Sequence, residues 1–456
     1  MTVQGDRQWS SGLMFLAAAI GSAVGIANIW KFTYVAGGNG GGAFVLIYVI
    51  ALFCIALPAL VAELMIGRRG GRSVVGTMAV LREREGIGRG WKAYGVMAVT
   101  TVFIALSFYC VVAGWTIDYF RVAVSGAFRG MDATSSGAAL AAMHASPMRM
   151  IVFQTLFIGL TVWIVAAGIH AGLERALKLL TPGLFLILLI MLGYAMIAGD
   201  AAAGLTFLFR PNWAELTPAV VLFAVGQAFF SLGVGVGVIM TIGAYMDRNI
   251  PIVPSGIVIA AADGAVALIA AMVMFPIVFA HGLSPAQGPG LIFATLPVAF
   301  GQMNGGAILG PMFFLLMAFA ALSSSITLLE SIIATLEDYT GLTRIPLTLI
   351  TGLALWLVGL GTVFSFNLWA DFHPLGFIAA LDGRTLYDLK GLAVANVLMP
   401  AGGILLAVLA GWIIARRSSA EELGMRRELA YRGWRLLVRW VVPSVVILVF
   451  AVNLLA

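Results

Sequence analysis

The chain has 456 residues, of which 61% are hydrophobic and only 10% are charged, and its mean hydropathy is +1.04. This composition excludes a soluble globular domain of that length and indicates a polytopic membrane protein. The net charge of +6 comes from basic residues between the apolar segments. Such charges set membrane topology, so we expect contacts with membrane lipid and no nucleic-acid partner.

Eleven stretches are apolar and long enough to cross the membrane, which takes roughly 20 residues of helix for about 30 Å of hydrocarbon. Backbone groups in lipid must pair within their own segment, so the predicted fold class is all-α with eleven transmembrane helices. The stretches lie at 12–36, 43–66, 92–124, 150–169, 174–198, 217–245, 252–280, 309–336, 345–369, 387–415 and 438–455.

The basic residues are divided unequally between the two sets of loops that these spans define. One set holds nineteen Lys and Arg residues, beginning with Arg7, and the other holds five. Cytoplasmic loops keep the excess of positive charge. We therefore expect a multi-pass protein of the cell inner (plasma) membrane with a cytoplasmic N-terminus. After an odd number of spans, the C-terminus is expected on the extracellular or periplasmic side.

The first span contains the sequence GSAVGIAN at 21–28, in which two glycines, a serine and Asn28 interrupt an apolar helix. Unwinding a helix in hydrocarbon frees backbone N–H and C=O groups, which are costly when they stay unpaired. Such a break persists where it binds something. Freed N–H groups suit a carboxylate, and freed carbonyls suit a hard cation such as sodium.

Two polar residues follow inside the second and third spans. Glu63 lies in LVAELMIG near the cytoplasmic end of its span. Either a structural role, satisfied by Arg, hydroxyl or backbone groups, or a proton-carrying role fits such a carboxylate. Tyr109 lies in the middle of LSFYCVV, where its hydroxyl needs a partner, so we expect it to point inward.

The sixth span is broken at FFSLGVGVG, residues 229–237. The two breaks take corresponding places when 1–200 (spans 1 to 5) and 201–415 (spans 6 to 10) are copies of one unit with inverted topology. Matched broken helices in two halves point to a midplane binding site in secondary transporters. Residues 416–456 then form a charged cytoplasmic connector, with amphipathic interfacial character at 416–437, and span 11.

The seventh and eighth spans carry further oxygen-bearing side chains. Asp263 lies in an apolar run, where an ionised carboxylate costs at least ~2.5–3.5 kcal/mol unless it is solvated or paired, so it is a functional candidate. Ser323, Ser324 and Ser325 are consecutive, and residues this close present two hydroxyls to one neighbouring helix. Between these spans, LIFATLPVAF in the outer loop 281–308 predicts a short helix folded over the outer face.

Through these segments the sequence resembles the neurotransmitter:sodium symporter family, in particular its bacterial amino-acid transporters. The resemblance covers most of the chain and rests on several long motifs in the same order. They are AAAIGSAVGIANIWKF, NGGGAF, ELMIGRRGG, AVGQAFFSLGVGVG, GPGLIFATLP and ALSSSITLLESIIATLED. The resemblance implies a LeuT-like fold with inverted five-helix repeats and broken helices 1 and 6. An eleven-span chain is also similar to bacterial members, many of which lack a twelfth span.

The resemblance implies two sodium sites. The first would use the carbonyl of Ala23, the side chains of Asn28, Ser231 and Asp263, and the carboxylate of the substrate. The second would use the carbonyls of Gly21, Val24 and Ala320 with the hydroxyls of Ser323 and Ser324. Family members that require chloride have Asn and Ser where this sequence has Asp263 and Ala267, so we expect no chloride requirement.

The resemblance also implies where an amino acid binds. Its carboxylate would meet N–H groups from Gly25 to Ala27 and the Tyr109 hydroxyl, and its amino group would face main-chain carbonyls. The walls around its side chain are small and uncharged, which favours a neutral hydrophobic substrate. The implied substrate-binding residues are Ala23, Gly25, Ile26, Ala27, Ala105, Tyr109, Phe230, Ser231, Gly233, Val236, Ser324 and Leu328.

The resemblance also implies two gates, one on each side of the substrate site. Outside, Phe230 would close over the substrate beneath a charge pair, but Lys31 stands where Arg is usual and Gly391 falls where the acid is expected. Asp388 is the nearest carboxylate to that position. Inside, the segment around Arg7 and Trp9 would pair with Asp338, near Tyr245.

These features predict a sodium-coupled secondary symporter that imports neutral hydrophobic L-amino acids, bulky aliphatic or aromatic, by alternating access. Two alternatives remain: a proton-coupled permease of the same fold, and an amino-acid sensor or channel that does not transport. Protonation of Asp263 or Glu63 after sodium release is a further hypothesis, since it would permit proton antiport. An enzyme is not expected, because the sequence lacks metal-ligand spacing, a Gly-x-Ser-x-Gly elbow and a phosphate loop. The sequence predicts neither the oligomeric state nor the preferred amino acid.

Overall fold

A computed structural model describes residues 8–286, 288, 290–425 and 427–455. In that part of the chain the secondary structure is helical, apart from one isolated bridge between Gly41 and Pro211. The α-helices are α1 Gly12–Ala23, α2 Ile26–Ile29, α3 Lys31–Gly38, α4 Gly42–Ala51, α5 Leu57–Gly70, α6 Val74–Glu85, α7 Trp91–Val124, α8 Ala133–His144, α9 Pro147–Ala166, α10 Arg175–Ala198, α11 Ala201–Phe209, α12 Pro218–Ser231, α13 Val238–Ala244, α14 Ile252–Ala280, α15 Leu296–Gln302, α16 Gly306–Thr340, α17 Arg344–Phe364, α18 Leu386–Leu392, α19 Met399–Val408, α20 Arg416–Leu423, α21 Glu428–Leu436 and α22 Val442–Leu455.

Short π-helical and 3-10 turns join several of these helices. A π-turn adds one residue to a helical turn, and it often occurs near functional sites. The π-turns are η2 Leu52–Ala56, η3 Ile169–Glu174, η5 Leu291–Thr295, η7 Ala393–Leu398, η8 Leu409–Ile413 and η9 Leu437–Val441. The 3-10 turns are η4 Trp213–Glu215 and η6 Ala379–Leu381.

The membrane spans agree with the prediction in place but differ in continuity. Among the described residues, nine helices are apolar and long enough to cross a membrane without interruption. A tenth span is the pair Gly12–Ala23 and Ile26–Gly38, bent by 57°. The predicted sixth span is two short helices, α12 and α13, separated by residues 232–237. All eleven predicted segments are therefore helical, and the first and sixth are the broken ones.

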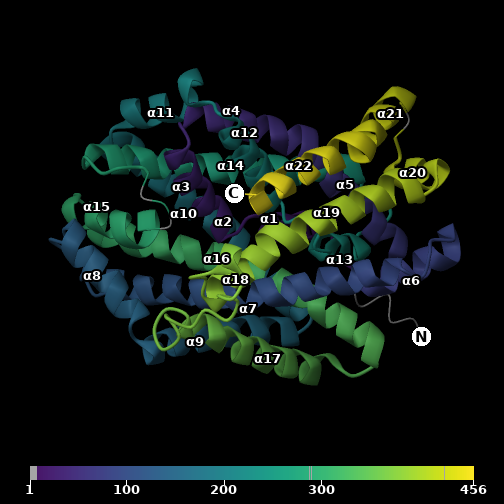
Figure 1. Ribbon diagram of the computed structural model, residues 1–456, viewed down its shortest axis with the longest axis horizontal. Helices are drawn as coiled ribbons and strands as arrows, with labels where there is room; N and C mark the ends of the chain where they lie inside the picture. The colour runs from purple at the N-terminus through teal and green to yellow at the C-terminus, as the bar shows by residue number, and fades with distance from the viewer. Residues whose placement is uncertain (1–7, 287, 289, 426, 456) are drawn as a thin grey trace.

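The loop helices lie at opposite ends of the molecule, with the long helices α7 and α16 extending between them (Figure 1). At one end, on the right in Figure 1, lie α6, α20 and α21, which belong to the arginine-rich loops. At the other end lie α8, α11 and α15. The two sets of loops that differ in charge are thus separated in space.

Several loop helices were not predicted from the sequence. The segment 125–149 contains α8, which begins after Asp132, whose carboxylate accepts the Ser135 N–H at 2.7 Å as an N-cap. Helices α6 and α11 also lie outside the segments for which the sequence predicts helices. The predicted outer short helix is confirmed as η5 and α15, and the connector 416–437 forms two helices, α20 and α21.

The broken helices occupy the centre of the bundle. Helix α1 packs against α10, α14 and α16, and α2 packs against α14 and α16. Helix α13 packs against α5 and α16. The residues between the halves of both broken spans are therefore enclosed by α5, α14 and α16, which are the helices that carry Glu63, Asp263 and the three serines.

Candidate ion and substrate site

The break in the first span depends on a close approach of its backbone to α7 and α16. Val24 and Gly25 are extended, so α1 ends at Ala23 and α2 begins at Ile26. A Cβ on Gly25 would lie 2.8 Å from the Ser324 hydroxyl oxygen and 3.4 Å from that of Tyr109. Only glycine fits there without displacing one of these groups. The Gly25 N–H donates to Asn28 Oδ1 at 3.0 Å, which fixes the turn.

The break in the sixth span is held by one buried carboxylate. Gly235 and Gly237 have φ of +92° and +84°, a conformation that favours glycine. Their N–H groups each donate to Glu63 at 2.8 Å, one to each carboxylate oxygen. Glu63 has no solvent-exposed area. The backbone of the unwound segment is thus what satisfies Glu63, which supports the structural interpretation of this residue.

The two broken spans meet at Asp263 of α14, which is fully buried. Ser231 Oγ donates to Asp263 Oδ2 at 2.6 Å, and Asn28 Nδ2 donates to Asp263 Oδ1 at 2.7 Å. Asn28 Nδ2 also donates to Ser231 Oγ at 2.8 Å. The three side chains predicted for the first sodium site therefore lie together, although they are far apart in the sequence.

A fourth residue, Tyr48, completes this cluster, and the sequence analysis did not single it out. Its hydroxyl donates to Asp263 Oδ2 and to Ser231 Oγ, each at 3.5 Å. Tyr48 is fully buried in α4. A tyrosine in the middle of the apolar run FVLIYVIA carries the same signal that identified Tyr109, namely a hydroxyl that needs an internal partner.

The orientation of Asn28 has a consequence for cation binding. Its amide nitrogen faces Asp263 and Ser231, while its oxygen accepts from Gly25. An N–H donor beside a carboxylate partly neutralises it, much as a cation would. Sodium takes oxygen ligands, so coordination by the Asn28 side chain requires the amide to turn and present Oδ1 in place of Nδ2.

The consecutive serines of α16 divide between two neighbours. Ser324 Oγ contacts the carbonyls of Gly21 at 3.2 Å and Val24 at 3.1 Å, at the end of α1. Ser323 Oγ donates to the carbonyl of Ala320 at 3.0 Å, and its Cβ lies 3.4 Å from where a Cβ on Gly21 would be. The five groups predicted for the second sodium site are therefore neighbours.

The third serine faces away from this cluster. Ser325 Oγ lies 2.9 Å from Thr161 Oγ1 of α9. A residue missed in the sequence, Thr181 of α10, has a buried hydroxyl without a hydrogen-bond partner among the described residues. That oxygen would lie 3.6 Å from a Cβ on Gly21, so it is a further oxygen beside the predicted second site.

Tyr109 and the predicted pocket walls surround the same break. The Tyr109 hydroxyl contacts the Ala321 carbonyl at 3.4 Å and lies next to Gly25, as predicted for an inward-facing residue. A Cβ on Gly233 would meet nothing within 4 Å, so this glycine faces open space. Of the other predicted side-chain walls, Ile26 and Val236 are buried, whereas Ala105, Phe230 and Leu328 are half-buried.

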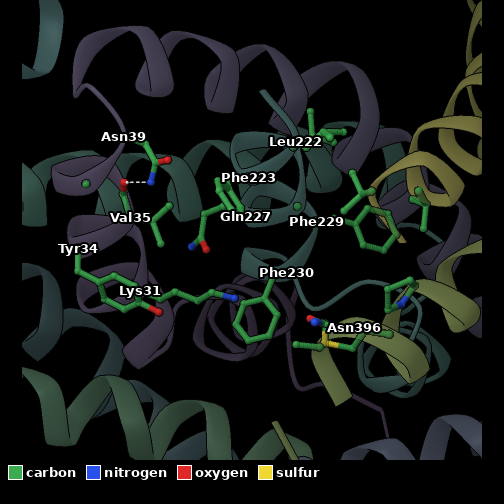
Figure 2. Close-up of a pocket in the computed structure, with 18 of the residues that line it drawn as sticks. Lys31, Tyr34, Val35, Asn39, Leu222, Phe223, Gln227, Phe229, Phe230 and Asn396 are labelled. Carbon is green, nitrogen blue, oxygen red and sulfur yellow. Dashed lines mark hydrogen bonds between the residues drawn. The ribbon is translucent and has the colours of Figure 1, made fainter. Parts of the chain in front are cut away.

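At the predicted outer gate, Lys31 contacts Phe230. The Lys31 ammonium lies 3.7 Å from the centroid of the Phe230 ring. Figure 2 shows the end of the Lys31 side chain against this ring. Gln227 lies beside them, and its buried side-chain amide has no hydrogen-bond partner among the described residues. Above this layer a cavity of about 510 Å³ is lined in part by Lys31, Gln227, Phe230 and Asn396.

Asp388, the nearest carboxylate suggested for the outer gate, caps its own helix in this structure. Asp388 Oδ2 accepts the N–H of Thr385 at 3.0 Å and its hydroxyl at 2.8 Å, which caps α18. Within the described ranges, no ion pair joins Lys31 to Asp388, and the cation instead contacts the Phe230 ring. A carboxylate three residues into a helix after Thr is typical of a capping box, and the sequence TLYD contains that signal.

Two residues of the predicted inner gate, Trp9 and Tyr245, lie together. The Trp9 N–H donates to the Tyr245 carbonyl and its indole N–H to the Ile242 carbonyl, each at 3.2 Å. Asp338 Oδ2 accepts the N–H of Ser73 at 3.0 Å, at the start of α6. Arg7, the predicted partner of Asp338, lies outside the described residues.

Comparisons with known proteins show which family this chain resembles. The model of the sodium:neurotransmitter symporter family matches residues 6–132 and 142–368. The uncharacterized sodium-dependent transporter YhdH of Bacillus subtilis (strain 168) is 35% identical over 456 residues, covering 99% of this chain and 98% of YhdH. Sodium-dependent nutrient amino acid transporter 1 of Drosophila grimshawi is 25% identical, covering 84% and 69% of the two chains.

A solved structure shares the fold. The crystal structure of MhsT in complex with L-phenylalanine has a TM-score of 0.87 and 36% sequence identity to this chain, and it covers 97% of this chain and 99% of MhsT. The predicted LeuT-like fold is thereby confirmed. The matched family and relatives are transporters, which confirms that the protein is a multi-pass membrane transporter and not an enzyme. The chain belongs to the sodium:neurotransmitter symporter family.

Proposed function

We propose that the protein is a sodium-coupled, chloride-independent symporter that imports neutral hydrophobic L-amino acids by alternating access. The observation that carries this proposal is the buried cluster of Asn28, Ser231 and Asp263, which joins both broken spans through one carboxylate. The similarity to MhsT, whose structure holds L-phenylalanine, and to sodium-dependent nutrient amino acid transporters supports an amino-acid substrate.

The charges favour two sodium ions without chloride. An ionised Asp263 would supply, beside the first sodium ion, the negative charge that chloride supplies in chloride-dependent members of the family, so no further anion is needed. The first ion would replace the donor groups that now face Asp263, and it would share the carboxylate of the substrate. The second ion would take the place of the hydrogen bonds from the Ser324 hydroxyl to the Gly21 and Val24 carbonyls, and the hydroxyl would keep its proton and turn its oxygen to the ion.

Ion and substrate binding are coupled because the first sodium ion and the substrate would share the substrate carboxylate and would both contact the two broken spans. Asn28 belongs to the first broken span and Ser231 to the sixth, so a cation between them ties the two half-helices together. Ser323 and Ser324, beside Gly21, favour sodium coupling over proton coupling. Two adjacent hydroxyls beside freed carbonyls can coordinate a sodium ion, and a proton-coupled permease would be expected to lack them. We further propose that 1–200 and 201–415 are the two inverted repeats.

The driving force is sufficient for accumulation. Each sodium ion that enters contributes ~2.3 kcal/mol per 100 mV of membrane potential. It contributes about 1.4 kcal/mol more for each tenfold concentration gradient. Two ions under both conditions supply roughly 7 kcal/mol, or about 10⁵-fold accumulation of the amino acid.

Uptake of labelled amino acids into proteoliposomes tests the proposal. We expect leucine, phenylalanine and other neutral hydrophobic amino acids to accumulate in an inward sodium gradient, and equally when gluconate replaces chloride. Uptake driven by a proton gradient alone would favour the permease. A requirement for external chloride would contradict the charge balance at Asp263.

Ser324→Ala is expected to weaken the apparent sodium affinity of uptake by about tenfold, the equivalent of ~1.4 kcal/mol. The substitution removes the hydroxyl between the Gly21 and Val24 carbonyls. Ser325→Ala is the matched control, because Ser325 is adjacent in sequence but contacts Thr161 instead. Equal sodium affinities in the two variants would exclude Ser324 as a sodium ligand.

Tyr109→Phe is expected to lower amino-acid affinity at saturating sodium by about tenfold or more, because a hydrogen bond to a charged group contributes ~1.5–3 kcal/mol. Tyr119→Phe, on the same helix, provides the control, since the buried Tyr119 hydroxyl has no hydrogen-bond partner in the described part of the chain. Scintillation proximity with labelled phenylalanine measures both affinities. Unchanged affinity in Tyr109→Phe would remove this hydroxyl from the carboxylate site.

A further inference from the structure

The connector between spans 10 and 11 builds a basic hollow at one end of the bundle. Helices α20 and α21 lie at that end, and α21 continues through η9 into α22 (Figure 1). Arg432, Arg435 and Arg439 follow at spacings of three and four, so they share one helix face. Together with Arg416, Leu436 and Trp440 they line a hollow of about 360 Å³.

The positive charge of this hollow is only partly balanced. Glu428 forms ion pairs with both Arg416 and Arg432. Arg435 donates to neutral oxygens, among them the Tyr431 hydroxyl at 2.7 Å, and it has no acidic partner among the described residues. Four guanidinium groups therefore face one carboxylate, and the hollow attracts an anion.

Arg439 brings a buried guanidinium nitrogen to the hollow. Its guanidinium carbon lies 5.3 Å from the Trp412 ring and 5.7 Å from the Trp440 ring. Its Nε is buried and has no hydrogen-bond acceptor within the described ranges. A Cβ on Gly411 would lie 2.9 Å from the Arg439 Cα, so glycine lets span 10 approach this arginine closely. The packing therefore fixes the Arg439 guanidinium in place and leaves its Nε–H free to bind a ligand.

The rim of the hollow is apolar and exposed. Leu436, Trp440 and Leu429 are 57%, 59% and 83% exposed, although each is large and hydrophobic. Leu429 lies at the start of α21, whereas Leu436 and Trp440 line the hollow and lie where α21 passes through η9 into the apolar helix α22. Exposed leucine and tryptophan beside arginine at the end of a span are typical of the membrane interface, where the cation faces headgroups and the apolar groups face acyl chains.

We propose that this hollow binds the phosphate headgroup of an anionic phospholipid, with the acyl chains lying along Leu436 and Trp440. Arginine suits phosphate because its planar fork donates two parallel hydrogen bonds. Clusters of basic residues beside the cytoplasmic end of a span attract anionic lipid. The apolar rim selects a lipid over a free phosphate, since only a lipid covers it. The site lies outside the ion and substrate cluster, and it does not depend on the proposed transport function.

Native mass spectrometry of the full chain tests this proposal. The protein in neutral detergent is mixed with equal amounts of phosphatidylglycerol and phosphatidylcholine with the same acyl chains, and retained lipid is counted. We expect retention of phosphatidylglycerol, and no displacement of it by an excess of inorganic phosphate. Equal retention of the two lipids would overturn the proposal, and displacement by phosphate alone would make the hollow a free-anion site and overturn the lipid assignment.

The double substitution Arg435→Gln with Arg439→Gln is expected to lower phosphatidylglycerol retention about thirtyfold, the equivalent of ~2 kcal/mol for two basic residues. Arg432→Gln is a second variant that is not expected to disturb folding, because the Arg432 side chain is 67% exposed. We expect it to lower phosphatidylglycerol retention about fivefold. Arg417→Gln is the matched control on the same connector, being 90% exposed and paired with Glu421. Equal retention by all the variants would overturn the site.

Discussion

Asp263→Asn is expected to reduce sodium-dependent uptake by at least about a hundredfold. Asp263 is the one carboxylate in the cluster that joins the two broken spans, and it accepts from Asn28, Ser231 and Tyr48. A unit charge about 4 Å from a cation contributes ~4 kcal/mol at an effective dielectric constant of 20, or roughly a thousandfold in affinity before desolvation is counted. The amide keeps the shape of the side chain but removes this charge.

Uptake and sodium binding of the purified variant measure this effect. Asp388→Asn is the control, because that carboxylate caps its own helix and is expected to leave sodium affinity unchanged. With Ala267→Ser added to Asp263→Asn, we expect some uptake to return in chloride, because the resemblance places a chloride-dependent arrangement at these positions. Wild-type sodium affinity in Asp263→Asn would contradict the proposed first sodium site.

Glu63→Gln has the second largest expected effect, and it acts on the fold of the break itself. The carboxylate accepts two N–H groups from the unwound segment of span 6. Glutamine has one acceptor oxygen, so its amide group would face one of these donors and leave it unpaired. Loss of one charge-assisted hydrogen bond and burial of an unpaired N–H cost about 3–5 kcal/mol together.

The expected results for Glu63→Gln are a lower thermal unfolding midpoint in detergent, by several degrees, and loss of most uptake. Glu421→Gln is the control, because Glu421 is 61% exposed and pairs with Arg417 at the surface. Measuring uptake against pH separates the two roles considered for Glu63. A variant with the wild-type midpoint that has lost only its pH dependence would favour proton transfer over the structural role.

The spans, both breaks and the residues around them could be predicted from the sequence because each follows from one local rule. Apolar length predicts a span, and polar or glycine residues inside it predict a break. An intramembrane carboxylate such as Asp263 needs partners, which identified it without knowledge of which residues they were. The structure then supplied the partners, Asn28 and Ser231.

Other features depend on tertiary contacts that no local pattern contains. Glu63 is satisfied by backbone groups 172 and 174 residues further along, which only the packing of α5 against α13 brings near. The Asn28 amide points its nitrogen toward Asp263. This orientation is set by the neighbouring Asp263, Ser231 and Gly25, which the local sequence pattern does not reveal. Asp388 was assigned to the outer gate by its position, although its own helix uses it as a cap.

The most direct test of sodium-coupled amino-acid recognition is equilibrium binding of labelled L-phenylalanine to the purified protein. Binding is compared in sodium and in potassium, each with chloride and with gluconate. We predict saturable binding that requires sodium, is indifferent to chloride and is weakened in Asp263→Asn. Binding of the same strength in potassium would contradict the account, because the amino acid would then not need the cation that Asn28, Ser231 and Asp263 are proposed to hold.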